Sequence, residues 1–187
     1  TKIPRKTVGA ALAAADSDLG RRAAADLPAL TIEHLGWLAE FDDDQDTAAR
    51  LLEVFTNRPD QARHALERAR QDRAEHAAIQ AAHALITAAH PDTTPLPGEV
   101  YATPGAAYLT RLSDAHGNPS SADDHAGCPG DAYVLHLDRY TDPDTIGADD
   151  RDRITADGHT FRIVWVCADW ASNGHRDRWA NRPQADA

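Results

Sequence analysis

The sequence contains no methionine, and its 187 residues include only two cysteines. The missing Met, even at position 1, leads us to expect a piece of a longer protein. Two cysteines are too few for the disulfide framework of a small secreted protein. No stretch approaches the ~18 apolar residues of a membrane span, and there is no secretory leader. We therefore expect a cytoplasmic chain without membrane contact.

Positive charge is also scarce, because 19 Lys and Arg residues face 30 Asp and Glu residues and the formal net charge is −11. This balance excludes general affinity for polyanions, so any nucleic-acid contact must be local. The sequence has no P-loop, GxSxG, HExxH or GxGxxG motif, and we expect no enzymatic activity. The length allows one domain or two small ones.

The first 90 residues are rich in Ala and carry apolar residues at helical spacing. They predict a helical stretch over 7–25 that is interrupted at Gly20, a helix after Thr31 as N-cap, and a helix after Asp46 as N-cap. Residues 1–60 should therefore form a compact helical bundle. A long connecting helix should cover 61–90. Its apolar face is too small to hold an isolated helix rigid, so we expect it to be covered by the preceding helices or, through self-association, by a second copy.

The second half of the chain has a different character. Four prolines between residues 91 and 105 predict a stiff linker and a domain boundary. Beyond it, the runs AYLTRL, DAYVLHL and TFRIVWVC are rich in β-branched and aromatic residues and predict a small β module over 106–187. The acidic stretch 141–158 lacks periodicity and should form a mobile hairpin loop. The predicted fold class is therefore α+β.

Both cysteines lie near histidines, in the clusters His125-Ala-Gly-Cys128 and Cys167-Ala-Asp-Trp-Ala-Ser-Asn-Gly-His175. Cys128 precedes the first strand of a predicted antiparallel pair and Cys167 ends the second. The two ends of such a pair are neighbours, so folding should bring all four side chains together. Two thiols and two imidazoles match a closed, tetrahedral structural zinc site. We therefore predict that these four residues bind Zn²⁺.

Other roles for these residues remain open. The cysteines can be ordinary buried thiols or a redox disulfide, and His116, His136 or His159 can replace a nominated histidine. A zinc- or thiol-dependent hydrolase would use Cys128 as nucleophile with His125 as base, or activate water with one of the nearby carboxylates. The candidates for that carboxylate are Asp123, Asp124 and Asp169.

The start of the chain is the only dense basic group before the long helix. Lys2, Arg5 and Lys6 fall within eight residues that contain no acid, and Thr7 can begin a helix. Basic and hydroxyl side chains at a helix N-terminus are the usual means by which a helix-turn-helix contacts DNA phosphates and base edges. These four residues are the candidate DNA-binding residues.

Several segments together resemble the later region of actinobacterial ParB-type partition proteins. They are IPRKTVGAAL, LTIEHLGWLAEFDDDQDTAARLLE, ARHALERARQDRAEHAA, and the pair DDHAGCPGDAYV and WVCADWASNGHRDRW. The resemblance implies that residues 1–60 are the tail of a helix-turn-helix domain, and that the cellular role is plasmid or chromosome segregation through double-stranded DNA. The family's nucleotide-binding clamp domain and the first helix of its helix-turn-helix are not among these residues. The alternative to a DNA-binding protein is a scaffold or dimerisation region that contacts only proteins.

Overall fold

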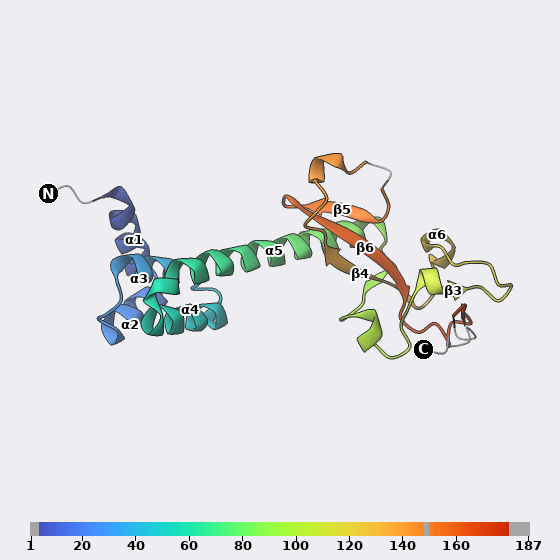
Figure 1. The fold of residues 1–187 in the computed structure, drawn as a ribbon, viewed down its shortest axis with the longest axis horizontal. Helices are drawn as coiled ribbons and strands as arrows, with labels where there is room; N and C mark the ends of the chain where they lie inside the picture. The colour runs from blue at the N-terminus through green and yellow to red at the C-terminus, as the bar shows by residue number, and fades with distance from the viewer. Residues whose placement is uncertain (1–3, 148–149, 180–187) are drawn as a thin grey trace, which may run out of the picture. The chain divides into compact units, whose positions relative to one another are not determined.

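The computed structural model describes residues 4–147 and 150–179, and it contains both helices and sheets (Figure 1). The expected α+β fold class is therefore confirmed. The chain divides into two compact units, Thr1–Ala74 and Glu75–Ala187. This division falls inside the long helix and not at the predicted linker. Among the described residues, no helix is both long enough and apolar enough to cross a membrane.

Unit 1 is a bundle of short helices followed by the first part of the long helix. Its elements are α1 (Arg5–Asp16), α2 (Asp18–Asp26), α3 (Ile32–Ala39), α4 (Gln45–Asn57), the 3₁₀ turn Pro59–Gln61, and the start of α5 (Ala62–Ala89). The predicted bundle and long helix are therefore present, to within a few residues. These helices do not by themselves establish a helix-turn-helix or partition-protein fold.

Side-chain caps fix where three of these helices begin. The hydroxyl of Ser17 accepts a hydrogen bond from the Gly20 N–H and starts α2, while Thr31 caps α3 as predicted. The break between the first two helices thus lies at Ser17 and not at Gly20, because Gly20 is part of the first turn of α2. Asp44, and not Asp46, caps α4 by accepting from the Thr47 N–H. A short side-chain oxygen at the N-cap satisfies a backbone donor that the helix leaves unpaired.

The core of unit 1 lies between α3, α4 and the first half of α5. Leu38, Phe41, Leu51, Phe55 and Leu66 are all buried there. The preceding helices therefore cover the apolar face of α5 in this half, as expected. Exposed ion pairs add to the contact: Arg70 binds the Glu40 carboxylate and Arg73 binds Asp43.

Unit 2 is built around a five-stranded sheet. The strands run in the order β1 (Thr94–Pro95), β4 (Asp131–Leu137), β6 (His159–Cys167) and β2 (Ala107–Tyr108), and β5 (Arg153–Ala156) also pairs with β6. β4 and β6 form a seven-residue antiparallel ladder from Asp131↔Cys167 to Leu137↔Phe161. A separate two-stranded sheet joins β3 (Leu112–Ser113) to β7 (Arg176–Asp177). The remaining elements are 3₁₀ turns at Val100–Ala102, Leu109–Arg111 and Pro143–Thr145, and the one-turn helix α6 (Ala122–His125).

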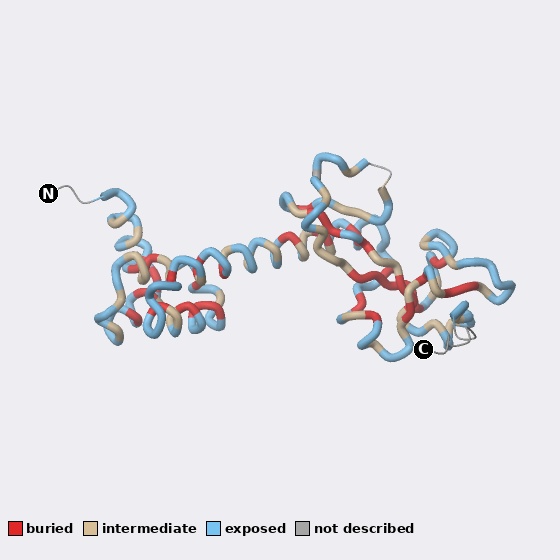
Figure 2. Tube along the Cα trace, in the orientation of Figure 1, coloured by how far each residue is buried: buried red, intermediate tan, exposed pale blue. Residues whose placement is uncertain are grey.

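The second half of α5 packs on this sheet, and buried residues appear again there after a stretch of the helix that has none (Figure 2). Ala78 and Ala82 contact the cluster around Phe161, and Ile86 packs with Tyr133 and Ile163. Small alanine side chains let the helix approach the sheet closely. The sequence predicted that the preceding helices or a second copy of the chain would cover the apolar face of α5. In this half of the helix the sheet of unit 2 covers that face instead, so these residues give no argument for a second copy.

The predicted linker at 91–105 is instead part of unit 2. β1 pairs in parallel with β4, and the Leu96 N–H donates to the Tyr133 carbonyl. Leu96 and Val100 are buried in a cluster with Ala132. Pro95 is compatible with this pairing because β1 lies at the edge of the sheet, where one side of the strand needs no donor. The predicted loop 141–158 contains the strand β5 and the 3₁₀ turn Pro143–Thr145, so the prediction of a loop without regular structure was wrong for these residues.

Candidate metal centre

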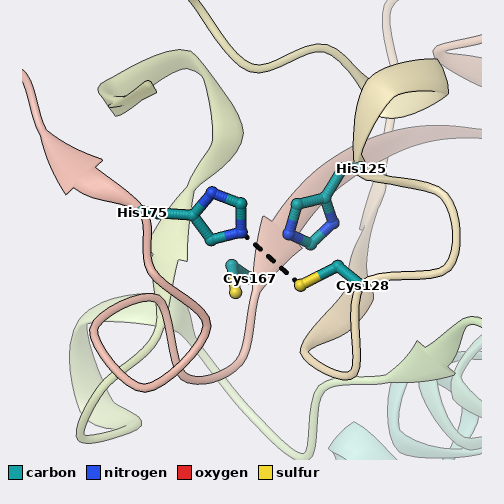
Figure 3. Close-up of side chains that lie close together, drawn as sticks. All are labelled: His125, Cys128, Cys167 and His175. Atoms are coloured by element: carbon teal, nitrogen blue, oxygen red, sulfur yellow. Dashed lines mark hydrogen bonds between the residues drawn. The ribbon is translucent and has the colours of Figure 1, made fainter. Parts of the chain in front are cut away.

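Unit 2 brings His125, Cys128, Cys167 and His175 into one cluster (Figure 3). One ligand atom from each residue lies within 4.8 Å of every other. His125 and Cys167 are buried, and the other two are half-buried. Both cysteines are free thiols. The predicted convergence is confirmed, and the arrangement can hold a metal ion.

The β4–β6 ladder explains how the two sequence clusters meet. Because Asp131 pairs with Cys167, the residues just before β4 lie beside the end of β6. Tight turns carry the ligands back to this point: the Asp131 N–H donates to the Cys128 carbonyl, and the Cys128 N–H donates to the His125 carbonyl. The antiparallel pairing inferred from sequence therefore places His125, Cys128 and Cys167 in the cluster.

His175 reaches the cluster through a turn after β6. Gly174 has a φ of +76°, a conformation that glycine adopts without steric cost. The His175 N–H donates to the Trp170 carbonyl, and β7 begins at the next residue. The Nε2 atom of His175 lies 3.5 Å from the Cys128 Sγ. Burial lowers the pKa of His175, and the neighbouring His125 lowers it further, which favours the neutral imidazole that binds metals.

His125 is held in one orientation by Asp131. Its Nδ1 donates to the Asp131 carboxylate over 2.8 Å, and the other oxygen of that carboxylate accepts from the Thr93 hydroxyl. The Nε2 of His125 is buried and has no hydrogen-bond partner among the described residues. Buried polar atoms usually have a partner. An imidazole fixed by a carboxylate on one nitrogen and directed into a cluster by the other is the usual arrangement of a metal-bound histidine.

The Cys167 side chain is fully buried, and its sulfur accepts hydrogen bonds. Its sulfur accepts from the Asn173 side-chain amide over 3.7 Å and from the Asp169 backbone N–H. Burial raises the pKa of its thiol to about 11, so a metal that binds near neutral pH must displace the proton. Gly130 faces this sulfur, and a Cβ there would lie 2.7 Å from it. Gly130 is therefore needed for close approach.

The alternative residues lie outside the cluster. His116, His136 and His159 are not among the four ligating residues, and His159 instead contacts the Asp157 carbonyl through Nδ1. The cluster also contains no carboxylate. Asp123 is ion-paired with Arg151, and Asp124 accepts from the Ser121 hydroxyl. Asp169 accepts from the Ser172 N–H, so each carboxylate proposed as a catalytic base has a structural partner.

The candidate DNA-binding residues belong to unit 1, apart from this cluster in the chain. Arg5, Lys6 and Thr7 form the first turn of α1, and Lys2 lies outside the described residues. Arg5 and Lys6 are exposed, and Lys6 Nζ lies 3.9 Å from the Glu33 carboxylate. The helix begins at Arg5 after Pro4, so Thr7 does not act as its cap.

Sequence reasoning missed the residues that surround the ligands. Asp131, Thr93 and Asn173 were not singled out. A signal for Asp131 does exist, because an acid at the start of an otherwise apolar strand, directly after a ligand turn, suggests a partner for a metal-bound histidine. Thr93 lies far from the clusters in sequence and becomes recognisable only through the β1–β4 pairing.

Comparisons with known proteins give no relative for this chain: no protein-family model, curated protein or solved structure matches it.

We expect Asp131→Asn to weaken metal binding about 10–100-fold, the usual effect of removing a carboxylate behind a ligating histidine. The neutral amide holds the His125 ring less firmly and makes it less basic. A competition titration with a chromogenic chelator measures the affinity. Asp138→Asn changes a carboxylate that also accepts hydrogen bonds, from Thr141, but outside the cluster. Equal affinity in both variants would contradict the assigned role of Asp131.

Proposed function

We propose that unit 2 is a structural zinc module in a non-enzymatic binding protein. The observation that supports this most directly is the convergence of two thiols and two imidazoles. One imidazole has a buried Nε2 with no partner in the described part of the chain. Tetrahedral zinc holds sulfur at about 2.3 Å and nitrogen at about 2.0–2.1 Å, so ligand sulfur and nitrogen lie about 3.6 Å apart. The Cys128 Sγ to His175 Nε2 distance of 3.5 Å agrees with this spacing.

The same donor set favours a structural over a catalytic ion. Catalytic zinc sites keep one coordination position for water or substrate, whereas four protein ligands fill the shell. Thiolate and imidazole ligands also select zinc over calcium or magnesium, which prefer oxygen. Zinc bound here would join α6, the turn before β4, the end of β6 and the segment before β7.

Metal analysis of the purified full chain tests this proposal. We expect about one zinc per chain, and both cysteines should react several-fold more slowly with thiol reagents before a chelator is added than after. Zinc affinity should rise with pH, because the raised pKa of Cys167 means that binding releases a proton. A chain that contains no zinc, takes up none and keeps the β module folded would refute the zinc site.

For the cellular role, we propose a ParB-like partition protein that contacts double-stranded DNA through the start of α1. The resemblance to partition proteins supports this role, as does the position of Arg5 and Lys6 in an exposed first helical turn. Backbone N–H groups at a helix N-terminus and basic side chains together favour phosphate. With a net charge of −11, the rest of the chain repels DNA, so this contact must be local and sensitive to salt.

We expect weak duplex binding whose affinity falls steeply with salt, by about 0.9 logarithmic units of affinity per logarithmic unit of salt for each phosphate neutralised. Reversing Lys2, Arg5 and Lys6 to Glu should abolish it. A control that makes the same change in net charge reverses three exposed arginines elsewhere in unit 1: Arg21, Arg22 and Arg58. Fluorescence anisotropy with a labelled duplex measures both. Equal loss in the two triple variants would assign the effect to total charge and not to this surface.

A protein-only scaffold is the second candidate, and it would act through apolar contacts. Val8 and Leu12 are exposed one turn apart on α1, and Ile32 is exposed on α3. Self-association through such residues would depend little on salt, in contrast to phosphate contacts. Sedimentation at several protein and salt concentrations separates the two candidates.

A further inference from the structure

The two cysteines of the metal centre have different surroundings. Cys167 is fully buried, while Cys128 is half-buried. Cys167 accepts hydrogen bonds from the Asn173 amide and the Asp169 N–H. Among the described residues, the hydrogen-bond partners of the Cys128 sulfur are the other ligands of the cluster, His175 Nε2 and the Cys167 thiol. A bound metal would replace both of these contacts.

This difference determines which sulfur reacts more readily with an electrophile. Hydrogen bonds from N–H groups withdraw electron density from a thiolate and lower its nucleophilicity, and burial blocks the approach of a reagent. With metal bound, Cys167 keeps its two N–H donors, whereas Cys128 keeps none from the described residues. Susceptibility to oxidation follows thiolate character and exposure, and both favour Cys128.

We infer that Cys128 is an oxidation site at which hydrogen peroxide attacks the metal centre, and that Cys167 is the thiolate that resolves the product. The inference rests on the proposed zinc site. In the first step the Cys128 thiolate attacks one peroxide oxygen, the O–O bond breaks, and a sulfenic acid and one hydroxide form. The Cys167 thiolate then attacks the sulfenic sulfur, forms the disulfide and releases a second hydroxide. The two sulfurs lose two electrons in total, which peroxide accepts, and zinc keeps its charge.

The geometry allows the second step after a local shift. The two sulfurs lie within 4.8 Å of each other, whereas a disulfide needs about 2.05 Å. Cys128 lies on a turn beside Gly127, whose φ of +85° marks a segment outside regular secondary structure. Once both sulfurs are in a disulfide, only two imidazoles remain to hold the ion. Oxidation should therefore release zinc.

Treating the zinc-loaded full chain with peroxide tests this site. We expect one zinc released for every two thiols lost, measured with a zinc-binding dye and a thiol assay. With less than one equivalent of N-ethylmaleimide, peptide mass spectrometry should place most of the label on Cys128. Label placed mainly on Cys167, or shared equally, would overturn the assignment.

A variant that leaves all four ligands intact tests the cause of the difference. Asn173→Ala removes one N–H donor from the Cys167 sulfur, so the share of label on Cys167 should rise several-fold. The side-chain amide of Asn118 donates to the Asp114 carboxylate, outside the cluster, so Asn118→Ala should leave the labelling unchanged. The same distribution in both variants would overturn the hydrogen-bond explanation.

The zinc content measured before oxidation separates the two proposals. A chain that binds no zinc refutes the zinc site and this inference together. A chain that binds zinc and retains it while excess peroxide persists refutes the oxidation site alone.

Discussion

Cys167→Ser should abolish zinc binding and unfold unit 2 while unit 1 keeps its helices. The free energy of zinc binding is folding free energy in small zinc domains and amounts to about 10 kcal/mol or more, which exceeds the stability of most small domains. Serine retains the approximate size of the side chain but is a poor zinc ligand. Hydrogen exchange followed by mass spectrometry measures each unit in the same chain, and metal analysis measures the zinc.

A pair of histidine variants provides the control for this result. His175→Ala should behave like Cys167→Ser, whereas His116→Ala changes an exposed residue outside the cluster and should retain zinc and stability. If Cys167→Ser bound no zinc yet showed native protection throughout β4 and β6, the ion would not be needed for folding. If Cys167→Ser retained one tightly held zinc, the ligand set would be wrong.

Ile86→Asp should be the most damaging substitution away from the metal cluster. Ile86 is only 2% exposed and packs with Tyr133 and Ile163, so the change removes apolar contacts and places a carboxylate against the sheet. Loss of a buried Ile and burial of an unpaired charge together should lower the free energy of unfolding by at least about 3 kcal/mol. Urea denaturation of the zinc-loaded chain measures this loss.

The adjacent residue provides a matched control. Leu85 precedes Ile86 on α5 but is 49% exposed, so Leu85→Asp introduces the same charge where water can solvate it. We expect this variant to change stability by no more than about 0.5 kcal/mol, as is usual for exposed positions. Equal destabilisation by the two variants would mean that helix propensity, and not contact with the sheet, controls stability here.

Local signals explain most of what the sequence could predict. Thr31 as a cap and the apolar runs that became β4 and β6 are recognisable within a few residues. The convergence of the four residues could be predicted because two strands whose ends carry cysteines need only pair in the antiparallel sense to meet. That prediction required no knowledge of other contacts, and so it succeeded despite the intervening chain.

The remaining features depend on contacts between distant segments. Leu96 and Val100 lie in a proline-rich segment, which predicts a linker. They are core residues because β1 pairs with β4 and brings this segment onto the sheet. The alanine-rich end of α5 gives no sign of its partner, because Ala78 and Ala82 suit a helix packed on a helix or on a sheet equally well. The hydrogen bond between Asp131 and His125 could not be predicted, because it depends on the turn that places the His125 ring beside the carboxylate.

The position of β6 has a consequence for synthesis on the ribosome. β2, β4 and β5 all precede β6 in the chain, and each of them pairs with it. Chains emerge from the N-terminus, and domains generally fold as units in that order. The helices of unit 1 can therefore fold early. The strands β2, β4 and β5 cannot complete their pairing until β6 has been synthesised. Cys128 is also synthesised before Cys167 and His175. The full set of four side chains is therefore present only after synthesis has nearly reached β7, and metal binding would follow late in synthesis.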